Sequence, residues 1–287
     1  LSDIPSTYIE TSVRLIQSED KRLTSSASVS QEDQEINQTP FDASSLYERF
    51  DSTLLRGSPG AGKTTTLQNI FMKSAVDLLG YDYKDTFFPI YIRLNQFNSE
   101  RGTGVMDYVR EILPDTPDDD ILSGRIIMML DGLNEVTNPE ARATLTREIE
   151  SIDADLKGAK LILTTRPHGI MAELKMAVTE IQTLTQKQTQ ALISKALNED
   201  EEKTTNCLAF LKENVRFSTW ARSPLHLKML AEVFLERDKP IENQGKLVEG
   251  FVDKIYAREF TQGFPLANVE TLNHILGNLA VENIRTG

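Results

Sequence analysis

Hydrophobic and polar positions follow two different periods along this chain. From residue 46 onward, short apolar runs alternate with longer segments of helical period. The apolar runs occupy residues 52–57, 87–97, 125–133, 160–167 and 178–184. Three of them are rich in β-branched residues or apolar on both faces, which is typical of strands buried within a sheet. We therefore expect residues 46–185 to form an α/β domain, a parallel sheet with helices on both faces.

Helical periodicity separates these runs and continues alone after about residue 186. Apolar residues recur near every third and fourth position, which indicates amphipathic helices. The segments between the apolar runs are 62–80, 104–113 and 138–158, and the later ones are 185–197, 206–215, 223–238, 244–260 and 268–284. The Ser223-Pro224 pair marks a helix start, because proline at the first helical position loses no hydrogen bond. We expect a small helical domain over residues 186–240, followed by a further helical region over 241–287.

The N-terminal part, residues 1–45, has a different composition. Residues 17–45 are poor in large apolar side chains and rich in Ser, Gln, Glu and Asp. Such a segment buries too little surface to offset the entropy lost on ordering, which predicts a flexible linker or a long surface loop. The preceding residues, 6–16, fit either a strand or a short helix.

Composition limits the classes of function. The 287 residues are 39% hydrophobic and 26% charged, as in an ordinary globular protein. The net charge of −12 argues against nucleic acid or anionic lipid as a partner of the whole chain, although a local basic patch is compatible with it. The single cysteine, Cys207, excludes an internal disulfide and fits a reducing compartment, so we expect a cytoplasmic protein.

The apolar runs and the first residues indicate whether the chain carries a membrane segment or a signal peptide. The longest apolar runs fall far short of the roughly 20 residues that span a bilayer, so we expect no membrane segment. The first residues lack the basic start and apolar core of a signal peptide. The chain begins without Met, so we expect a fragment whose further domains lie outside it.

A phosphate-binding loop is the clearest chemical motif. Gly57, Gly62, Lys63 and Thr64 match the pattern G-x-x-x-x-G-K-[ST] between a predicted strand and a predicted helix. Glycines let the backbone N–H groups point at phosphate oxygens, Lys63 adds a positive charge, and the Thr64 hydroxyl is a candidate Mg²⁺ ligand. The alternative is a glycine-rich turn without a ligand. The candidate nucleotide-binding residues are Gly57, Ser58, Pro59, Gly60, Ala61, Gly62, Lys63, Thr64 and Thr65.

Two further motifs supply charged groups at strand ends. Asp131 follows the apolar run 126–130, where a P-loop protein needs a carboxylate to hold Mg²⁺ through water, and Glu135 lies four residues later. Arg166 follows the buried run at 160–165 and is a candidate for sensing or stabilising the γ phosphate. We expect Asp131, Glu135 and Arg166 to be the catalytic residues, with Thr64 and Asp131 at the metal.

Five motifs in this order resemble the NACHT family of STAND-type P-loop ATPases. They are GSPGAGKTTTL, FPIYIRLNQF, IIMMLDGLNEV, LILTTRPHG and SPLHLKMLAEVF, spread over residues 57–234. The resemblance implies an AAA+/STAND-like fold and a switch of innate immune or antiviral signalling. In such proteins ADP holds a closed monomer, and exchange for ATP opens an oligomer that activates an effector. It also implies that Lys63 and Thr64 form the Walker A pair, that Pro224 packs on adenine, and that residues 241–287 begin a winged-helix region.

One residue departs from the family pattern, which commonly reads Asp-Gly-x-Asp-Glu. Asn134 stands where the second Asp is expected, and an amide cannot accept a proton from water at neutral pH. Slow hydrolysis is therefore expected, with Glu135 as the remaining candidate base.

The leading hypothesis is thus an ATP/ADP switch that forms a homo-oligomer on activation, with sensor and effector domains outside this chain. The alternative is a continuously hydrolysing ATPase or motor, with or without a link to nucleic acid. A small-molecule kinase is a third reading, but it predicts a lid of clustered arginines, whereas residues 98–113 hold only Arg101 and Arg110.

Overall fold

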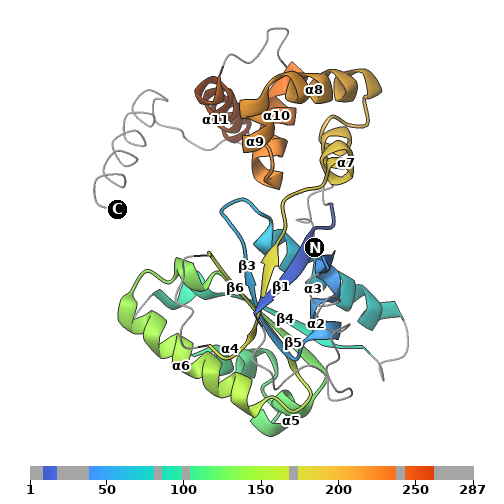
Figure 1. Cartoon of the computed structure of the whole chain (residues 1–287). Helices are drawn as coiled ribbons and strands as arrows, with labels where there is room; N and C mark the ends of the chain where they lie inside the picture. The colour runs from blue at the N-terminus through green and yellow to red at the C-terminus, as the bar shows by residue number, and fades with distance from the viewer. Residues whose placement is uncertain are drawn as a thin grey trace.

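The computed structural model describes residues 9–17, 39–80, 86–98, 104–167, 174–236 and 243–261. Within these ranges, seven strands form one sheet in the order β2–β1–β7–β3–β6–β5–β4 (Figure 1). The strands are β1 (Ser12–Gln17), β2 (Phe41–Asp42), β3 (Ser52–Arg56), β4 (Phe88–Arg93), β5 (Ile126–Asp131), β6 (Lys160–Thr165) and β7 (Ala177–Ile181).

The five strands from β7 to β4 are parallel, as the sequence predicts. Four of them lie within a predicted apolar run, and β7 begins at Ala177, one residue before the run at 178–184. In β5 every residue from Ile126 to Asp131 is buried, because a parallel sheet is covered on both faces. The prediction of an α/β fold is confirmed.

The edge formed by β1 and β2 is antiparallel, which makes the sheet mixed. Val13 of β1 pairs with Ile181 of β7 and with Phe41 of β2. Val13 is buried and Arg14 is exposed, so β1 alternates as a strand with one face on the core. Part of the predicted N-terminal segment therefore belongs to the sheet, and most of the predicted linker, residues 18–38, lies outside the described residues.

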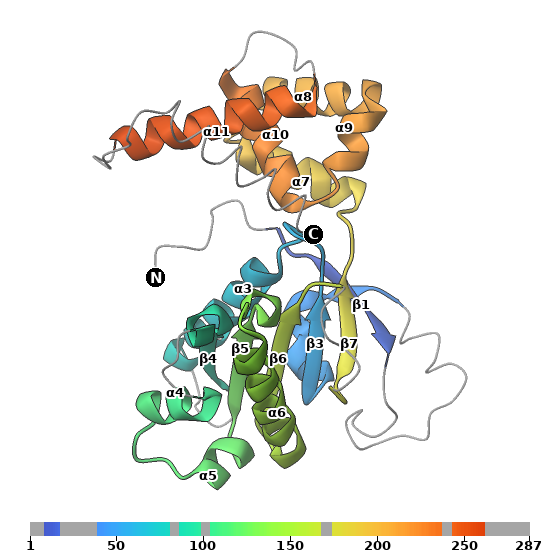
Figure 2. The same ribbon diagram turned by 90° about the vertical axis from the view of Figure 1, so that its left-hand side faces the viewer.

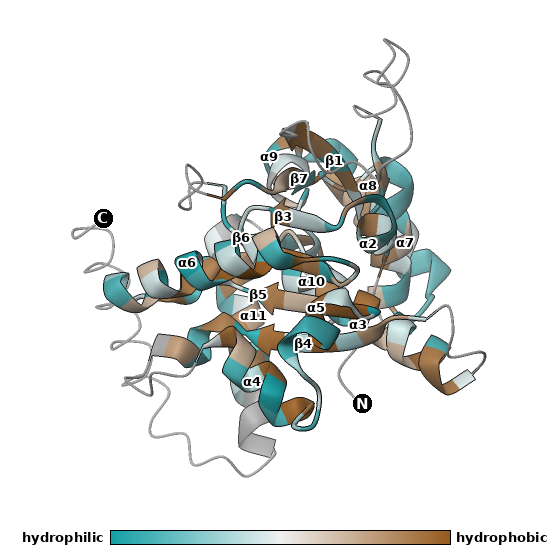
Figure 3. Ribbon diagram, turned by 90° about the horizontal axis from the view of Figure 1, so that it is seen from below, coloured by the Kyte–Doolittle hydropathy of each residue, from teal (hydrophilic) through white to brown (hydrophobic). Residues whose placement is uncertain are grey.

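Helices cover both faces of the sheet (Figure 2). Leu54 and Met128 pack with the face that α4 (Val105–Ile112), α5 (Asp118–Ser123) and α6 (Pro139–Asp155) cover. Their neighbours Leu55 and Met129 point to the other face, where α2 (Leu46–Arg49) and α3 (Lys63–Gly80) lie. Seen from below, β4 and β5 carry hydrophobic colours between the helices (Figure 3).

Within the described ranges, five helices follow the sheet and have a core of their own. They are α7 (Gln186–Ala196), α8 (Glu201–Glu213), α9 (Val215–Trp220), α10 (Pro224–Glu236) and α11 (Gln244–Thr261). Ile193, Cys207 and Leu230 are buried in this core. α7 begins with a capping box, in which the Thr185 hydroxyl accepts from the Gln188 N–H and the Gln188 side chain accepts from the Thr185 N–H. The helical part lies above the end of the sheet at which β7 leads into α7 (Figures 1 and 2).

Some predictions on the helical part extend beyond the structure. The predicted helix at 268–284 and most of the predicted winged-helix region, 241–287, lie outside the described residues, and the division into domains stays a prediction. Among the described helices, none is both long enough and apolar enough to cross a membrane.

Candidate functional site

The phosphate-binding loop joins the end of β3 to the start of α3. Gly60 and Gly62 have φ values of +74° and +100°, in the left-handed region that favours glycine. Within the loop the Ala61 N–H donates to the Ser58 carbonyl across 3.1 Å. The loop therefore curls directly before the first turn of α3, whose N–H groups have no partners within the helix and form an anion-binding end.

Lys63 begins α3 and folds back over the loop. Its Nζ donates to the carbonyl of Gly57 across 2.6 Å and to that of Ser58 across 3.2 Å. Burial lowers the pKa of the Lys63 ammonium group, and the positive charge of Arg166 lowers it further, whereas Asp131 and Glu135 raise it. Arg166, Asp131 and Glu135 therefore lie close enough to Lys63 for their charges to act on its ammonium group.

Asp131 ends β5 with both carboxylate oxygens engaged. Thr164, on the neighbouring strand β6, donates to Oδ1 across 2.6 Å, and Tyr91 of β4 donates to Oδ2 across 2.8 Å. The Thr164 hydroxyl also accepts from the N–H of Gly132, which has a φ of +85°. Burial raises the pKa of Tyr91, and the negative charge of Asp131 adds to this rise. The carboxylate is thus held in one orientation from both neighbouring strands.

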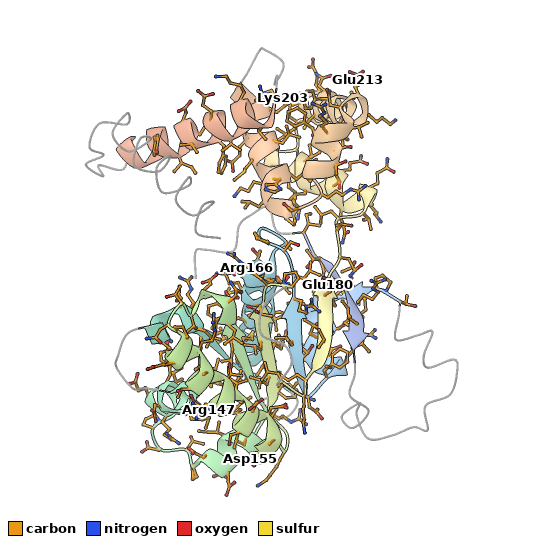
Figure 4. All side chains as sticks on the ribbon, turned by 60° about the vertical axis from the view of Figure 1, so that its left-hand side comes forward. Arg147, Asp155, Arg166, Glu180, Lys203 and Glu213 are labelled. Carbon is orange, nitrogen blue, oxygen red and sulfur yellow. The ribbon has the colours of Figure 1, made fainter. Side chains whose placement is uncertain are left out.

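Arg166 and Glu135 are exposed residues that line the same cavity as Lys63. Figure 4 shows Arg166 at the end of the sheet that faces the helical part, whereas Arg147 and Asp155 lie toward the opposite end. Arg166 therefore lines the same cavity as the phosphate-binding loop, and its role at a nucleotide stays a prediction.

The helical part reaches the loop through the first turn of α10. The backbone N–H of Leu225 donates to the Gly60 carbonyl across 3.3 Å. A Cβ atom placed on Gly60 would lie 2.8 Å from the Leu225 Cβ, so the close approach requires glycine. A Cβ atom on Gly62 would lie 3.9 Å from the Pro224 Cγ, in ordinary contact.

A cavity of about 420 Å³ lies between these elements. Its lining includes most of the residues predicted from the sequence, namely Pro59, Gly60, Gly62, Lys63, Thr64, Thr65, Asp131, Glu135, Arg166 and Pro224. Gly57, Ser58 and Ala61 belong to the loop but do not line the cavity.

Sequence reasoning missed several residues of this site. They are Ile9, Thr11, Gly132, Leu184, Leu192, Leu225 and Lys228 in the lining, and Tyr91 and Thr164, which donate to Asp131. Asn134, which the sequence marked as a departure from the family pattern, also lines the cavity. Thr11 contacts α3, where its hydroxyl lies 3.1 Å from that of Thr66. Leu225 had a signal, because it directly follows the proline that the family resemblance marks. The others depend on which strands and helices lie side by side.

The lining of the cavity combines two kinds of side chain. Lys63 and Arg166 carry positive charge beside the loop, which suits phosphate, whereas Ile9, Leu184 and Leu192 supply apolar surface suited to a flat ring. Thr64 and Asp131 offer the oxygen ligands that Mg²⁺ prefers. Among the described residues, no group of three or more His, Cys, Asp or Glu side chains is placed to hold a metal by itself. The residues fit Mg²⁺ that arrives with phosphate.

The chain is similar to known proteins in family and in fold. A family model described as the NACHT domain matches residues 51–200. No curated protein matches the chain significantly. Among solved structures, domain III of the Thermotoga maritima replication initiation protein DnaA is 13% identical, with a TM-score of 0.42 over 78% of this chain and 83% of that one.

Two other solved structures are similar at the same level. The Aeropyrum pernix ORC1 protein, in complex with DNA, is 16% identical, with a TM-score of 0.44 over 76% of this chain and 64% of that one. A RuvB variant from Thermotoga maritima is 16% identical, with a TM-score of 0.41 over 82% of this chain and 77% of that one.

Proposed function

This chain belongs to the NACHT family of P-loop NTPases, and from that premise we propose that it is an ATP/ADP-binding molecular switch. Nucleotide exchange gates self-association, which activates an effector in immune or defence signalling in the cytoplasm. Sensor and effector domains belong to parts of the protein other than the described residues.

A single observation carries this proposal: both parts of the molecule build the cavity. Lys63 of α3 and Asp131 of β5 come from the α/β part, whereas Pro224 and Leu225 come from α10. A nucleotide in this cavity contacts both parts, so its phosphate number can bias their relative position. A ligand shifts such an equilibrium only through different contacts in the two states, and a shared site provides them.

Each group of residues has its own role in binding the nucleotide. Loop N–H groups and Lys63 bind the phosphates, Thr64 and Asp131 hold Mg²⁺, and Arg166 distinguishes three phosphates from two. Pro224 packs on the base. When bound, Mg²⁺ neutralises charge on the β and γ phosphates.

Hydrolysis resets the switch slowly. Asn134 lines the cavity, and its Oδ1 is buried without a hydrogen-bond partner among the described residues. An amide oxygen can orient a water molecule but cannot take its proton. Glu135 lines the same cavity and supplies a carboxylate base, which is the observation that favours the second candidate, a continuously working ATPase.

Titration of ATP and ADP into the chain tests the proposal, with binding followed by calorimetry and phosphate release measured in the same samples. Lys63→Ala should abolish binding with the fold intact. The matched control is Lys73→Ala, which removes the same charge from an exposed position of α3 outside the cavity lining. Binding that survives Lys63→Ala would contradict the nucleotide site.

Turnover and mass separate the two candidate functions. The switch predicts turnover far below about 1 s⁻¹, together with a nucleotide-dependent mass of the full-length, triggered protein by light scattering. Sustained turnover above this rate, with a mass that does not change when nucleotide is added, would favour the working ATPase.

A further inference from the structure

Arg56, the last residue of β3, has no part in the function proposed above. Its Nη2 donates to the carbonyl of Pro167 across 2.7 Å. The next residue, Gly57, donates its N–H to the carbonyl of Thr165 across 3.3 Å. Two consecutive residues at the start of the phosphate-binding loop thus hold the carbonyls on either side of Arg166.

A contribution to the stability of the fold does not explain why residue 56 is an arginine. Its Nε is buried and has no hydrogen-bond partner among the described residues. A buried donor without a partner costs free energy, so an apolar residue would serve the fold as well or better. In register, Glu180 of β7 lies between Arg56 of β3 and Arg14 of β1, which places an opposite charge on the neighbouring strand.

The hydrogen bonds to the carbonyls of Thr165 and Pro167 restrain the backbone on either side of Arg166. Its side chain is exposed, and it follows directly after the last residue of β6, where the ladder to β3 ends at the pair Arg56 and Thr165. A long arginine side chain loses rotamer freedom when it is held at a ligand, and a fixed backbone limits that loss. Figure 4 shows Arg166 and Glu180 at the same end of the sheet, beneath the helical part.

We propose that Arg56 is a positioning residue that fixes the backbone around Arg166 and so sets the preference for nucleoside triphosphate over diphosphate. This inference rests on the proposed role of Arg166 at the γ phosphate. The ligand class is the nucleotide of the same cavity, and Arg56 itself touches no part of it.

Affinities for ADP and for a non-hydrolysable ATP analogue, both with Mg²⁺, test the proposal by calorimetry. The variants are Arg56→Met, Arg166→Ala and the double variant. Arg147→Met is the control, because this exposed arginine of α6 lies toward the opposite end of the domain (Figure 4). Their ADP affinities show whether each variant keeps a folded site.

Arg56→Met should lower the ratio of analogue affinity to ADP affinity by about fivefold, in the range of measured couplings between neighbouring residues. It should have no further effect when Arg166 is already alanine, and Arg56→Lys should give an intermediate ratio because it keeps the charge and a donor. If Arg56→Met does not fold, the same cycle with Arg56→Lys decides.

Other outcomes separate the two ideas. An unchanged ratio in Arg166→Ala would overturn the proposed sensing role of Arg166. A reduced ratio in Arg166→Ala with an unchanged ratio in the Arg56 variants would overturn the positioning role alone. An equal loss from the Arg56 change in both backgrounds would also overturn it, because Arg56 would then act without Arg166.

Discussion

The backbone N–H of Leu225, in the first turn of α10, donates to the carbonyl of Gly60, in the phosphate-binding loop, across 3.3 Å. The helical part therefore bonds to the main chain of the loop itself. Because the loop must accommodate phosphate, any ligand that changes its shape acts directly on this bond. The pair joins the nucleotide site to the part of the molecule that the proposed switch moves.

Replacement of Gly60 should disturb this junction. Gly60→Ala puts a Cβ atom 2.8 Å from the Leu225 Cβ at a φ of +74°, so either the loop or α10 must move. We expect a loss of about 1–3 kcal/mol in the free energy of unfolding, measured in urea, and weaker ADP binding. Gly80→Ala is the control, because an added Cβ there meets nothing within 4 Å. Equal losses from both variants would contradict the junction.

Restoring the acid at position 134 should speed hydrolysis. Asn134→Asp places a carboxylate in the cavity at the position where the amide cannot accept a proton. We expect phosphate release to rise by about tenfold or more, since a positioned base typically contributes at least that much. Asn134→Ala should give no rise. A rate unchanged by Asn134→Asp would show that Asn134 does not limit turnover.

The hydrogen bonds to Asp131 should stabilise the fold. Tyr91→Phe and Thr164→Val each remove a donor to the buried carboxylate. Hydrogen bonds to charged groups contribute about 1.5–3 kcal/mol each, so urea denaturation should detect both losses. The double variant should deviate from the sum, because the two residues share one carboxylate. Tyr108→Phe, at a half-buried tyrosine packed on the opposite face of the sheet, is the control and should cost less.

Cys207 should make the stability fall at high pH. Burial in the helical core raises the pKa of its thiol from 9.0 to about 12. The stabilising contribution is therefore complete below about pH 9 and is lost as pH rises toward 12, because the unfolded thiol ionises first. The free energy of unfolding should decline with a slope of up to about 1.4 kcal/mol per pH unit in excess of that of Cys207→Ala. Identical slopes in the two proteins would show that the thiol is not buried as described.

The sequence by itself determined the elements and the main chemical groups. Each apolar run from 52–57 to 178–184 coincides with a strand to within a residue at its start, because burial on both faces requires continuous apolar residues whatever the neighbours are. The phosphate-binding loop Gly57–Thr64 could be predicted for a similar reason, because its chemical groups lie in consecutive residues. Asp131 and Arg166 were readable as polar residues at the ends of such strands.

Tertiary structure alone decided which residues meet. The strand order places β6 beside β5 and β3, so that Thr164 holds Asp131 and Arg56 reaches the carbonyl of Pro167. Residues 6–16 fitted a strand or a helix until pairing with β7 and β2 made Ser12–Gln17 a strand. Local periodicity specifies the type of an element, but its neighbours depend on contacts between residues far apart in the chain. The packing of α10 on Gly60, 165 residues before Leu225, depends on such contacts and on the space that a missing Cβ leaves.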